Sequence, residues 1–230
     1  GGAVSRTHSG QVVTTGAMAP GAILQSIGGG GGSAGVRLTG VEAANAQIAL
    51  TLGGSGSALS SGADVTGLFD GGLMTTGSNS VALLAQSIGA GGGETRVLGA
   101  SGVAVSLGGQ ADAAGYAGAV SISNAGLIQT AGERSHGALL QSIGGGGGAV
   151  MTDAGDIEYS LNADNSGDGG AIMFVQAGDI LTQGDGSFGA ILQSLGGGGG
   201  WIDGVFAGSA GGAGQGGAVS FAIDGTIWAV

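Results

Sequence analysis

A twelve-residue motif recurs four times along the chain and constrains its fold more than any other feature. It reads GAILQSIGGGGG at 21–32 and has close copies at 82–93, 137–148 and 189–200. A motif that returns after tens of residues is typical of one supersecondary unit copied along an axis. The sequence therefore predicts a repeat array.

The spacing inside each repeat is constant. The motif glutamines are Gln25, Gln86, Gln141 and Gln193. A threonine lies eleven residues before each glutamine, at Thr14, Thr75, Thr130 and Thr182, and an apolar β-branched residue opens each repeat, at Val4, Val65, Val120 and Ile172. These columns define a constant part, 4–32 in the first copy, that ends with the glycine run and has no insertion or deletion in any copy. Its glutamines and threonines are interpreted as structural residues of the repeat.

The segments between the constant parts vary in length. They are Ser33–Asp64, Glu94–Ala119, Ala149–Ala171 and Trp201–Ala218, and each is shorter than the one before it. Such segments behave like surface loops on a fixed frame. We expect repeats at about 4–64, 65–119, 120–171 and 172–218, with the start of a fifth at 219–230, all within one domain that spans 1–230.

The residue pattern predicts strands and no helix. Glycine is 59 of 230 residues, but 42% of the residues are hydrophobic and only 8% are charged, which favours an ordered chain over a disordered linker. Apolar residues alternate at period two in 48–52, 103–107, 120–123 and 157–161. Short strands that repeat in register predict an all-β fold, a parallel β-solenoid or β-helix.

The number of coils in each repeat has two solutions. In the third repeat we predict five strands, at 120–123, 127–130, 138–143, 150–152 and 157–161. Five short strands fit either two three-sided coils, each formed by half a repeat, or one wide coil. We expect two coils, which would hold Gln25 and Gln86 about 10 Å apart along the axis. One coil would stack the glutamines as an amide ladder at about 5 Å.

The motif resembles the passenger repeats of large bacterial autotransporters and related surface adhesins. The resemblance rests on four exact or close copies of G-A-[IL]-L-Q-S-I-G-G-G-G-G, each preceded by a G-x-[IVL]-x-T-x-G segment, and it covers essentially the whole chain. It implies secretion to the outer surface of a Gram-negative cell as part of a longer passenger. It implies nothing specific about a ligand.

Charge and composition limit the partners. The net charge of −11 disfavours nucleic acid and anionic lipid as partners. The chain has no cysteine, and no apolar run reaches the ~18 residues that a membrane helix needs, so we expect no membrane insertion of this segment. A basic partner, divalent cations, a ligand on a host or neighbouring cell, and self-association end to end or laterally remain open.

The acidic residues offer the main candidates for chemistry. Seven carboxylates crowd into one stretch, at Asp153, Asp156, Glu158, Asp164, Asp168, Asp179 and Asp185. A pair of them at a suitable separation could serve glycoside hydrolysis, but this stretch has no Arg, Lys or His to assist. The oxygen-rich segment with Asn162, Asp164 and Asp168 is a weak calcium candidate without a recognised calcium motif. We expect solvated loop acids, no cofactor and no catalytic residue.

Serine and histidine are two further residue types that could perform chemistry. Their positions in this sequence favour a structural role instead. The motif serines Ser26, Ser87, Ser142 and Ser194 have no accompanying base in the sequence. His136 stands in the column of Pro20, Val81 and Phe188, where bulk is common, and His8 is isolated. The sequence therefore favours a non-enzymatic structural or adhesive stalk of a secreted bacterial surface protein. The alternatives are a self-polymerising extracellular fibre or sheath subunit and a polysaccharide-active β-helix enzyme.

Overall fold

A computed structural model describes residues 1–40, 45–54, 59–109, 114–161, 165–203, 205–207 and 212–230. The described residues form 22 β-strands and no α-helix. The all-β prediction is confirmed. No described segment forms an apolar helix of membrane-spanning length.

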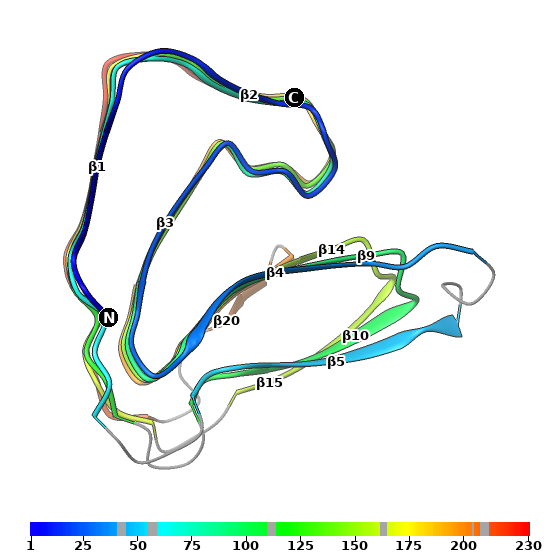
Figure 1. The fold of residues 1–230 in the computed structure, drawn as a ribbon, viewed down its shortest axis with the longest axis vertical. Helices are drawn as coiled ribbons and strands as arrows, with labels where there is room; N and C mark the ends of the chain where they lie inside the picture. Colours follow the sequence, from blue (N-terminus) through cyan, green and yellow to red (C-terminus); the bar gives the residue numbers. More distant parts are fainter. Residues whose placement is uncertain (41–44, 55–58, 110–113, 162–164, 204, 208–211) are drawn as a thin grey trace.

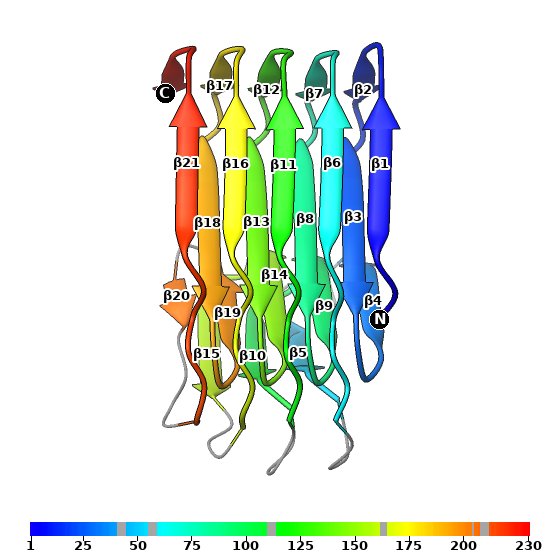
Figure 2. The ribbon, with the colours of Figure 1, turned by 90° about the vertical axis from the view of Figure 1, so that its left-hand side faces the viewer.

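Each repeat contributes one strand to each of several stacked sheets (Figures 1 and 2). The first sheet, in spatial order, holds β1 (Val4–His8), β6 (Val65–Phe69), β11 (Val120–Asn124), β16 (Ile172–Gln176) and β21 (Val219–Ile223). The second holds β2 (Val12–Thr14), β7 (Leu73–Thr75), β12 (Ile128–Thr130), β17 (Ile180–Thr182) and β22 (Ile227–Ala229). The third holds β3 (Ala22–Ile27), β8 (Leu83–Ile88), β13 (Ala138–Ile143) and β18 (Ala190–Leu195).

The two remaining sheets contain the glycine run and the variable segments. One holds β4 (Gly31–Arg37), β9 (Gly92–Leu98), β14 (Gly147–Thr152), β19 (Gly199–Ile202) and β20 (Val205–Ala207). The other, called the outer sheet below, holds β5 (Gln47–Leu52), β10 (Gly102–Leu107) and β15 (Asp156–Leu161). All pairs are parallel except β19 with β20. This arrangement of parallel strands in stacked sheets is consistent with the predicted β-solenoid.

One repeat makes one coil, so the prediction of two coils per repeat is wrong. Val4 pairs with Val65 and Gln25 with Gln86, one repeat apart in each case. The amide of Gln25 donates to that of Gln86 at 2.7 Å, which only directly stacked coils allow. The coil is wide because the β3 strands fold back between the β1 and β4 sheets instead of lying on the perimeter (Figure 1).

The strands of the third sheet are buried on both faces for this reason. Residues Leu83–Ile88 and Ala138–Ile143 are buried throughout. Leu140 packs into the core that lies against the first two sheets, whereas Leu139 belongs to a second core with Ala149 and Trp201 on the β4 side. A third core fills the space between the β4 sheet and the outer sheet. The coil thus has two lobes with a shared central sheet.

Candidate functional site

The motif glutamines form a continuous amide ladder along the stack. Nε2 of Gln86 donates to Oε1 of Gln141 at 2.6 Å, and Nε2 of Gln141 donates to Oε1 of Gln193 at 2.9 Å. The same Nε2 of Gln141 also donates to the Gly148 carbonyl at 3.2 Å. Buried amides need such partners, and here the neighbouring coils and the glycine run supply them. The ladder joins coil to coil and the β3 sheet to the β4 sheet.

The motif serines connect the variable segments to the central sheet. The Ser142 hydroxyl donates to the Gly118 carbonyl at 2.8 Å and accepts the Gly170 N–H at 2.7 Å. Ser87 makes the equivalent pair of bonds with Ala63 and Gly118. Each hydroxyl therefore bridges the ends of two successive variable segments. The recurring serines thus make the same pair of backbone bonds in successive coils.

The motif threonines close the turn between the second and third sheets. Thr14 and Thr75 donate to the carbonyls of Ala19 and Ser80 at 2.6 and 2.7 Å, and Thr130 bonds the Ser135 carbonyl in the same way. Thr182 occupies the same column, but its buried hydroxyl has no hydrogen-bond partner among the described residues. The turn is held by one side chain per coil in the first three repeats.

The backbone of the glycine run adopts conformations that disfavour any residue with a side chain. Gly145 and Gly146 have φ of 79° and 87°, and Gly147 and Gly148 have φ of 135° and 148°. A Cβ added to Gly147 would lie 1.9 Å from the Gly199 carbonyl oxygen of the next coil. Glycine is required here both for its positive φ and for the close approach of stacked backbones. Ala90, with φ of 60°, is the single non-glycine in the run and sits at the left-handed position that an L-residue reaches only with strain.

His136 is fully buried in an aromatic cluster, in agreement with the bulky residues of its column. Its ring lies edge-on to Trp201 at a centroid distance of 4.6 Å and contacts Phe188 at 5.5 Å. Nδ1 accepts the Phe188 N–H at 3.2 Å, whereas Nε2 has no partner among the described residues. Burial lowers the pKa of His136 from 6.5 to about 4. The histidine is therefore neutral at pH 7 and packs as an aromatic side chain.

The predicted calcium residues are only partly described. Asn162 and Asp164 lie outside the described residues. Asp168 is exposed, and its carboxylate accepts the Gln215 N–H of the next coil at 2.7 Å. Among the described residues no three His, Cys, Asp or Glu side chains gather closely enough to share a metal ion. What the structure shows at Asp168 is a coil-to-coil bond.

Other acids of the predicted cluster are similarly dispersed. Asp153 accepts the Gly99 N–H and Asp179 the Thr226 N–H, each at 2.8 Å and each on a neighbouring coil. Asp156 and Glu158 stand instead on the exposed face of the outer sheet. The structure therefore distributes these carboxylates over different faces of the stack.

A buried ion pair on β9 is absent from the sequence-based predictions. The carboxylate of Glu94 and the guanidinium of Arg96 bond each other, and both side chains are almost completely buried. Arg96 also donates to the Met18 carbonyl and the Ser33 hydroxyl at 2.6 Å, and Ser33 donates to Glu94 at 2.8 Å. The two residues stand two apart on a strand, so period-two alternation could have placed them on one face.

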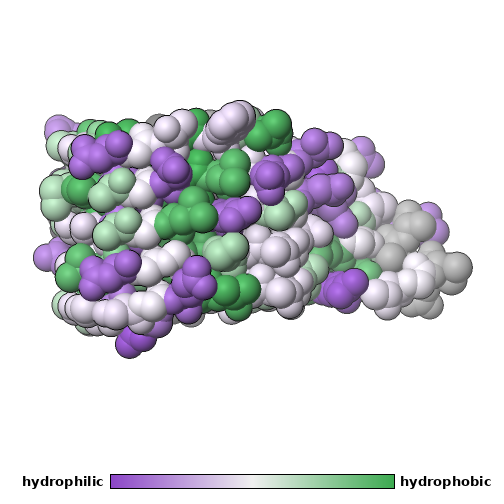
Figure 3. All heavy atoms as spheres, turned by 90° about the horizontal axis from the view of Figure 1, so that it is seen from above, coloured by the Kyte–Doolittle hydropathy of each residue, from purple (hydrophilic) through white to green (hydrophobic). Residues whose placement is uncertain are grey.

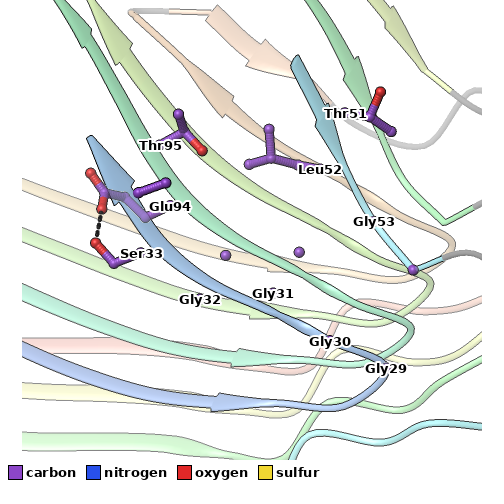
Figure 4. A pocket seen from close by; sticks show the side chains of 14 residues that line it. Gly29, Gly30, Gly31, Gly32, Ser33, Thr51, Leu52, Gly53, Glu94 and Thr95 are labelled. Atoms are coloured by element: carbon purple, nitrogen blue, oxygen red, sulfur yellow. Dashed lines mark hydrogen bonds between the residues drawn. The ribbon is translucent and has the colours of Figure 1, made fainter. Parts of the chain in front are cut away.

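The hollow beside this pair is lined mostly by backbone. Figure 4 shows Ser33 and Glu94 at one side and the glycines Gly29–Gly32 along its floor. Its volume is about 430 Å³, and Thr51 and Leu52 form the opposite wall. The Glu94 carboxylate is already bonded to Ser33 and Arg96. The hollow thus presents few side chains that could perform chemistry.

Much of the outer surface carries side chains that differ from coil to coil. On the top face, apolar and polar groups are interspersed along the axis (Figure 3). The outward-facing column of the β2 sheet reads Val13, Met74, Gln129, Leu181 and Trp228. On the outer sheet, the outward-facing columns combine Gln47 and several small residues with the two acids Asp156 and Glu158.

Comparison with known proteins gives no relative. No protein-family model, no curated protein and no solved structure matches this chain.

Proposed function

We propose that this chain is a non-enzymatic structural and adhesive stalk segment of a secreted bacterial cell-surface protein, built as a β-solenoid. One observation carries the proposal: every repeat stacks in register on the next, over sheets that run along the axis. Strand ladders and the glutamine ladder run along the axis in the same direction. Such a stack resists shortening or bending because each coil would have to break many bonds at once.

The use of the recurring side chains supports a structural role. The glutamines, serines and most of the threonines bond backbone or each other, and the glycines allow close stacking. A catalytic centre would need unlike groups that converge on one accessible point. In the described residues the acids bond neighbouring coils or face solvent on separate surfaces.

Location at the cell surface rests on the resemblance to autotransporter passenger repeats and on composition. The chain has no cysteine and a net charge of −11. A partner on a host or neighbouring cell would meet the variable segments, because they supply the outer sheet. Contact with that partner needs no cofactor.

The proposal is tested on intact cells that make the full protein. We expect protease added outside the cells to remove the epitopes of this chain, and antibodies against it to label the cell surface. Replacement of the exposed acids and small residues of the outer sheet is expected to reduce attachment while surface labelling is retained. Epitopes that stay protected until the cells are lysed would disprove the surface location.

A second assay addresses the enzyme alternative. The purified chain is incubated with a panel of acidic and neutral polysaccharides, and new reducing ends and unsaturated products are measured. We expect no turnover. Product formation that disappears in an Asp156→Asn and Glu158→Gln variant would replace the stalk proposal with an enzyme.

A further inference from the structure

The outer sheet ends inside the molecule, whereas the other sheets continue. It has three strands, in the order β15-β10-β5, and β15 is its last strand although the chain goes on to form β16–β22. In the next coil, β20 folds back and pairs antiparallel with β19 instead of extending β15 (Figure 2). No described strand pairs with the outer edge of β15.

Within the described part of the chain, the backbone groups on this side of β15 have no strand partner. The Asp156 N–H donates to the Ser101 carbonyl of the preceding coil at 3.2 Å. Residues of a parallel strand bond alternately to the two sides, so Asp156, Glu158 and Ser160 bond β10. Ile157, Tyr159 and Leu161 therefore direct their N–H and C=O groups to the open edge. A row of such groups is a template for another strand.

The side chains at the edge have a defined chemistry. Asp156 and Glu158 are exposed on the outward face, and they are the only charged residues in the three strands of the sheet. On the inward face Tyr159 is 51% exposed, whereas Val105 in the same column is 2% exposed. An added strand would cover this aromatic ring and extend the core below it.

We propose that the outer edge of β15 binds an extended, basic peptide segment of a partner protein, which adds a strand to the outer sheet. The pairing is β-augmentation, in which main-chain bonds give affinity and alternate side chains give specificity. Lysine or arginine at every second position would meet Asp156 and Glu158, and apolar residues between them would cover Tyr159. The net charge of −11 attracts such a partner over distance.

Charge also distinguishes this occupant from a second copy of the chain. Two β15 strands paired edge to edge would bring the carboxylates of Asp156 and Glu158 from both copies onto one face. Like charges on neighbouring strands are destabilising. A basic segment gains from the same carboxylates that oppose self-pairing.

The test uses the chain 1–230 and a fluorescent peptide with alternating lysine and valine. We expect saturable one-to-one binding by fluorescence anisotropy, weakened by salt. Two control peptides separate the contributions: one replaces lysine with glutamate, and the other keeps the lysines but has prolines at alternate positions. Neither control is expected to bind. Equal binding of the proline peptide would show a merely electrostatic contact and overturn the proposal.

Variants locate the binding edge. Asp156→Asn with Glu158→Gln is expected to lower affinity at least tenfold, whereas Asp185→Asn with Asp224→Asn, which changes the net charge equally, is expected to lower it less than twofold. Tyr159→Pro removes an N–H at the open edge without removing a bond to β10 and is expected to abolish binding. Tyr159→Ala keeps that N–H and is expected to retain measurable binding.

Amide hydrogen exchange provides a measurement that needs no variant. In the free chain the amides of Ile157, Tyr159 and Leu161 are expected to exchange much faster than that of Glu158, and the peptide is expected to slow all three at least tenfold. Slow exchange of these amides in the free chain, or a dimer that Tyr159→Pro dissociates, would overturn the proposal. Strand pairing at β15 does not depend on cell-surface location, so either proposal can fail without the other.

Discussion

At the scale of single residues, the glycine run is defined by backbone conformation and not by a need for flexibility. Four successive glycines in the third copy have positive φ, and the last two, at 135° and 148°, leave no room for a Cβ between stacked backbones. Ala90 is the exception, and its φ of 60° lies in the left-handed region that residues with a Cβ can still adopt. The run therefore distinguishes positions that demand glycine from one that only prefers it.

This distinction gives a prediction for two opposite substitutions. Gly147→Ala is expected to destabilise the fold by about 3 kcal/mol or more, because strain at an unfavourable φ is joined by overlap with a neighbouring coil. Ala90→Gly is expected to change stability by about 1 kcal/mol or less, because relief of left-handed strain offsets the added freedom of the unfolded chain. Urea denaturation monitored by far-UV circular dichroism measures both. Similar effects for the two variants would contradict this account of the glycine run.

The buried histidine predicts a loss of stability in mild acid. Its pKa is lowered to about 4 when folded, against 6.5 ordinarily, so the unfolded chain binds the proton more readily. Protonation of His136 therefore lowers the free energy of unfolding by about 3 kcal/mol in total. The loss is absent above pH 6.5 and grows as the pH falls toward 4.

The matched control is His136→Val, which copies Val81 of the preceding coil. This variant is expected to be less stable at pH 7, since the Phe188 N–H loses its acceptor, but its stability should depend much less on pH between 6.5 and 4. Denaturant midpoints at several pH values measure the difference. An unchanged slope in the variant would assign the acid sensitivity to other groups.

At the scale of elements, the interface between the β2–β3 turn and the β4 sheet is filled differently in each coil. Glu94 and Arg96 stand in register with Ala149 and Met151 of the next coil. The same space therefore holds an ion pair in one coil and apolar side chains in the next. The chain itself supplies the apolar replacement for a test of the ion pair.

Breaking this pair and replacing it should have different effects. Arg96→Met alone is expected to cost about 3–5 kcal/mol, because it leaves the Glu94 carboxylate buried without its partner. Glu94→Ala with Arg96→Met copies the third coil and is expected to recover most of that loss. Thermal and denaturant unfolding of both variants measure the coupling. A double variant no more stable than Arg96→Met would show that the carboxylate is not the cause of the loss.

Local elements could be predicted from the sequence, but the width of the coil could not. The strands expected at 138–143 and 157–161 match β13 and β15 to within one residue, because apolar alternation and turn residues mark them. In contrast, β14 begins at Gly147, whereas the sequence predicts this strand only from Val150, since residues without side chains carry no alternation. Burial of Ala138–Ile143 on both faces is typical of an internal strand, and it is the fold of the whole coil that produces it.

The candidate site was likewise predictable only in part, because some of its features depend on sequence spacing and others on the three-dimensional course of the chain. The spacing of Gln86 and Gln141 marks them as repeated, and the amide ladder is one of two arrangements that this spacing allows. The open edge of β15 depends instead on the path of the following coil, where β20 turns back onto β19. The alternation of apolar residues marks each strand but does not show whether β20 will pair with β15 or with β19.

At the scale of the whole molecule, one coil per repeat fixes the rise of the stack. Insertion of eight further copies of residues 65–119 after Ala119 is expected to lengthen the axis by about 38 Å, at about 4.8 Å per coil, with an unchanged cross-section. Small-angle X-ray scattering measures both dimensions. An increase twice as large would instead support two coils per repeat.

The long sequence separation between stacked strands also determines how such a chain must fold. Hydrogen-bonded partners in successive coils lie between 47 and 61 residues apart, so a coil forms its parallel sheets only together with a neighbouring coil. The first pair of coils closes loops of that size with few bonds in return, and each later coil docks on a finished template. Folding is thus a nucleation followed by growth, in which the slow step occurs once and the time to completion rises little with the number of repeats.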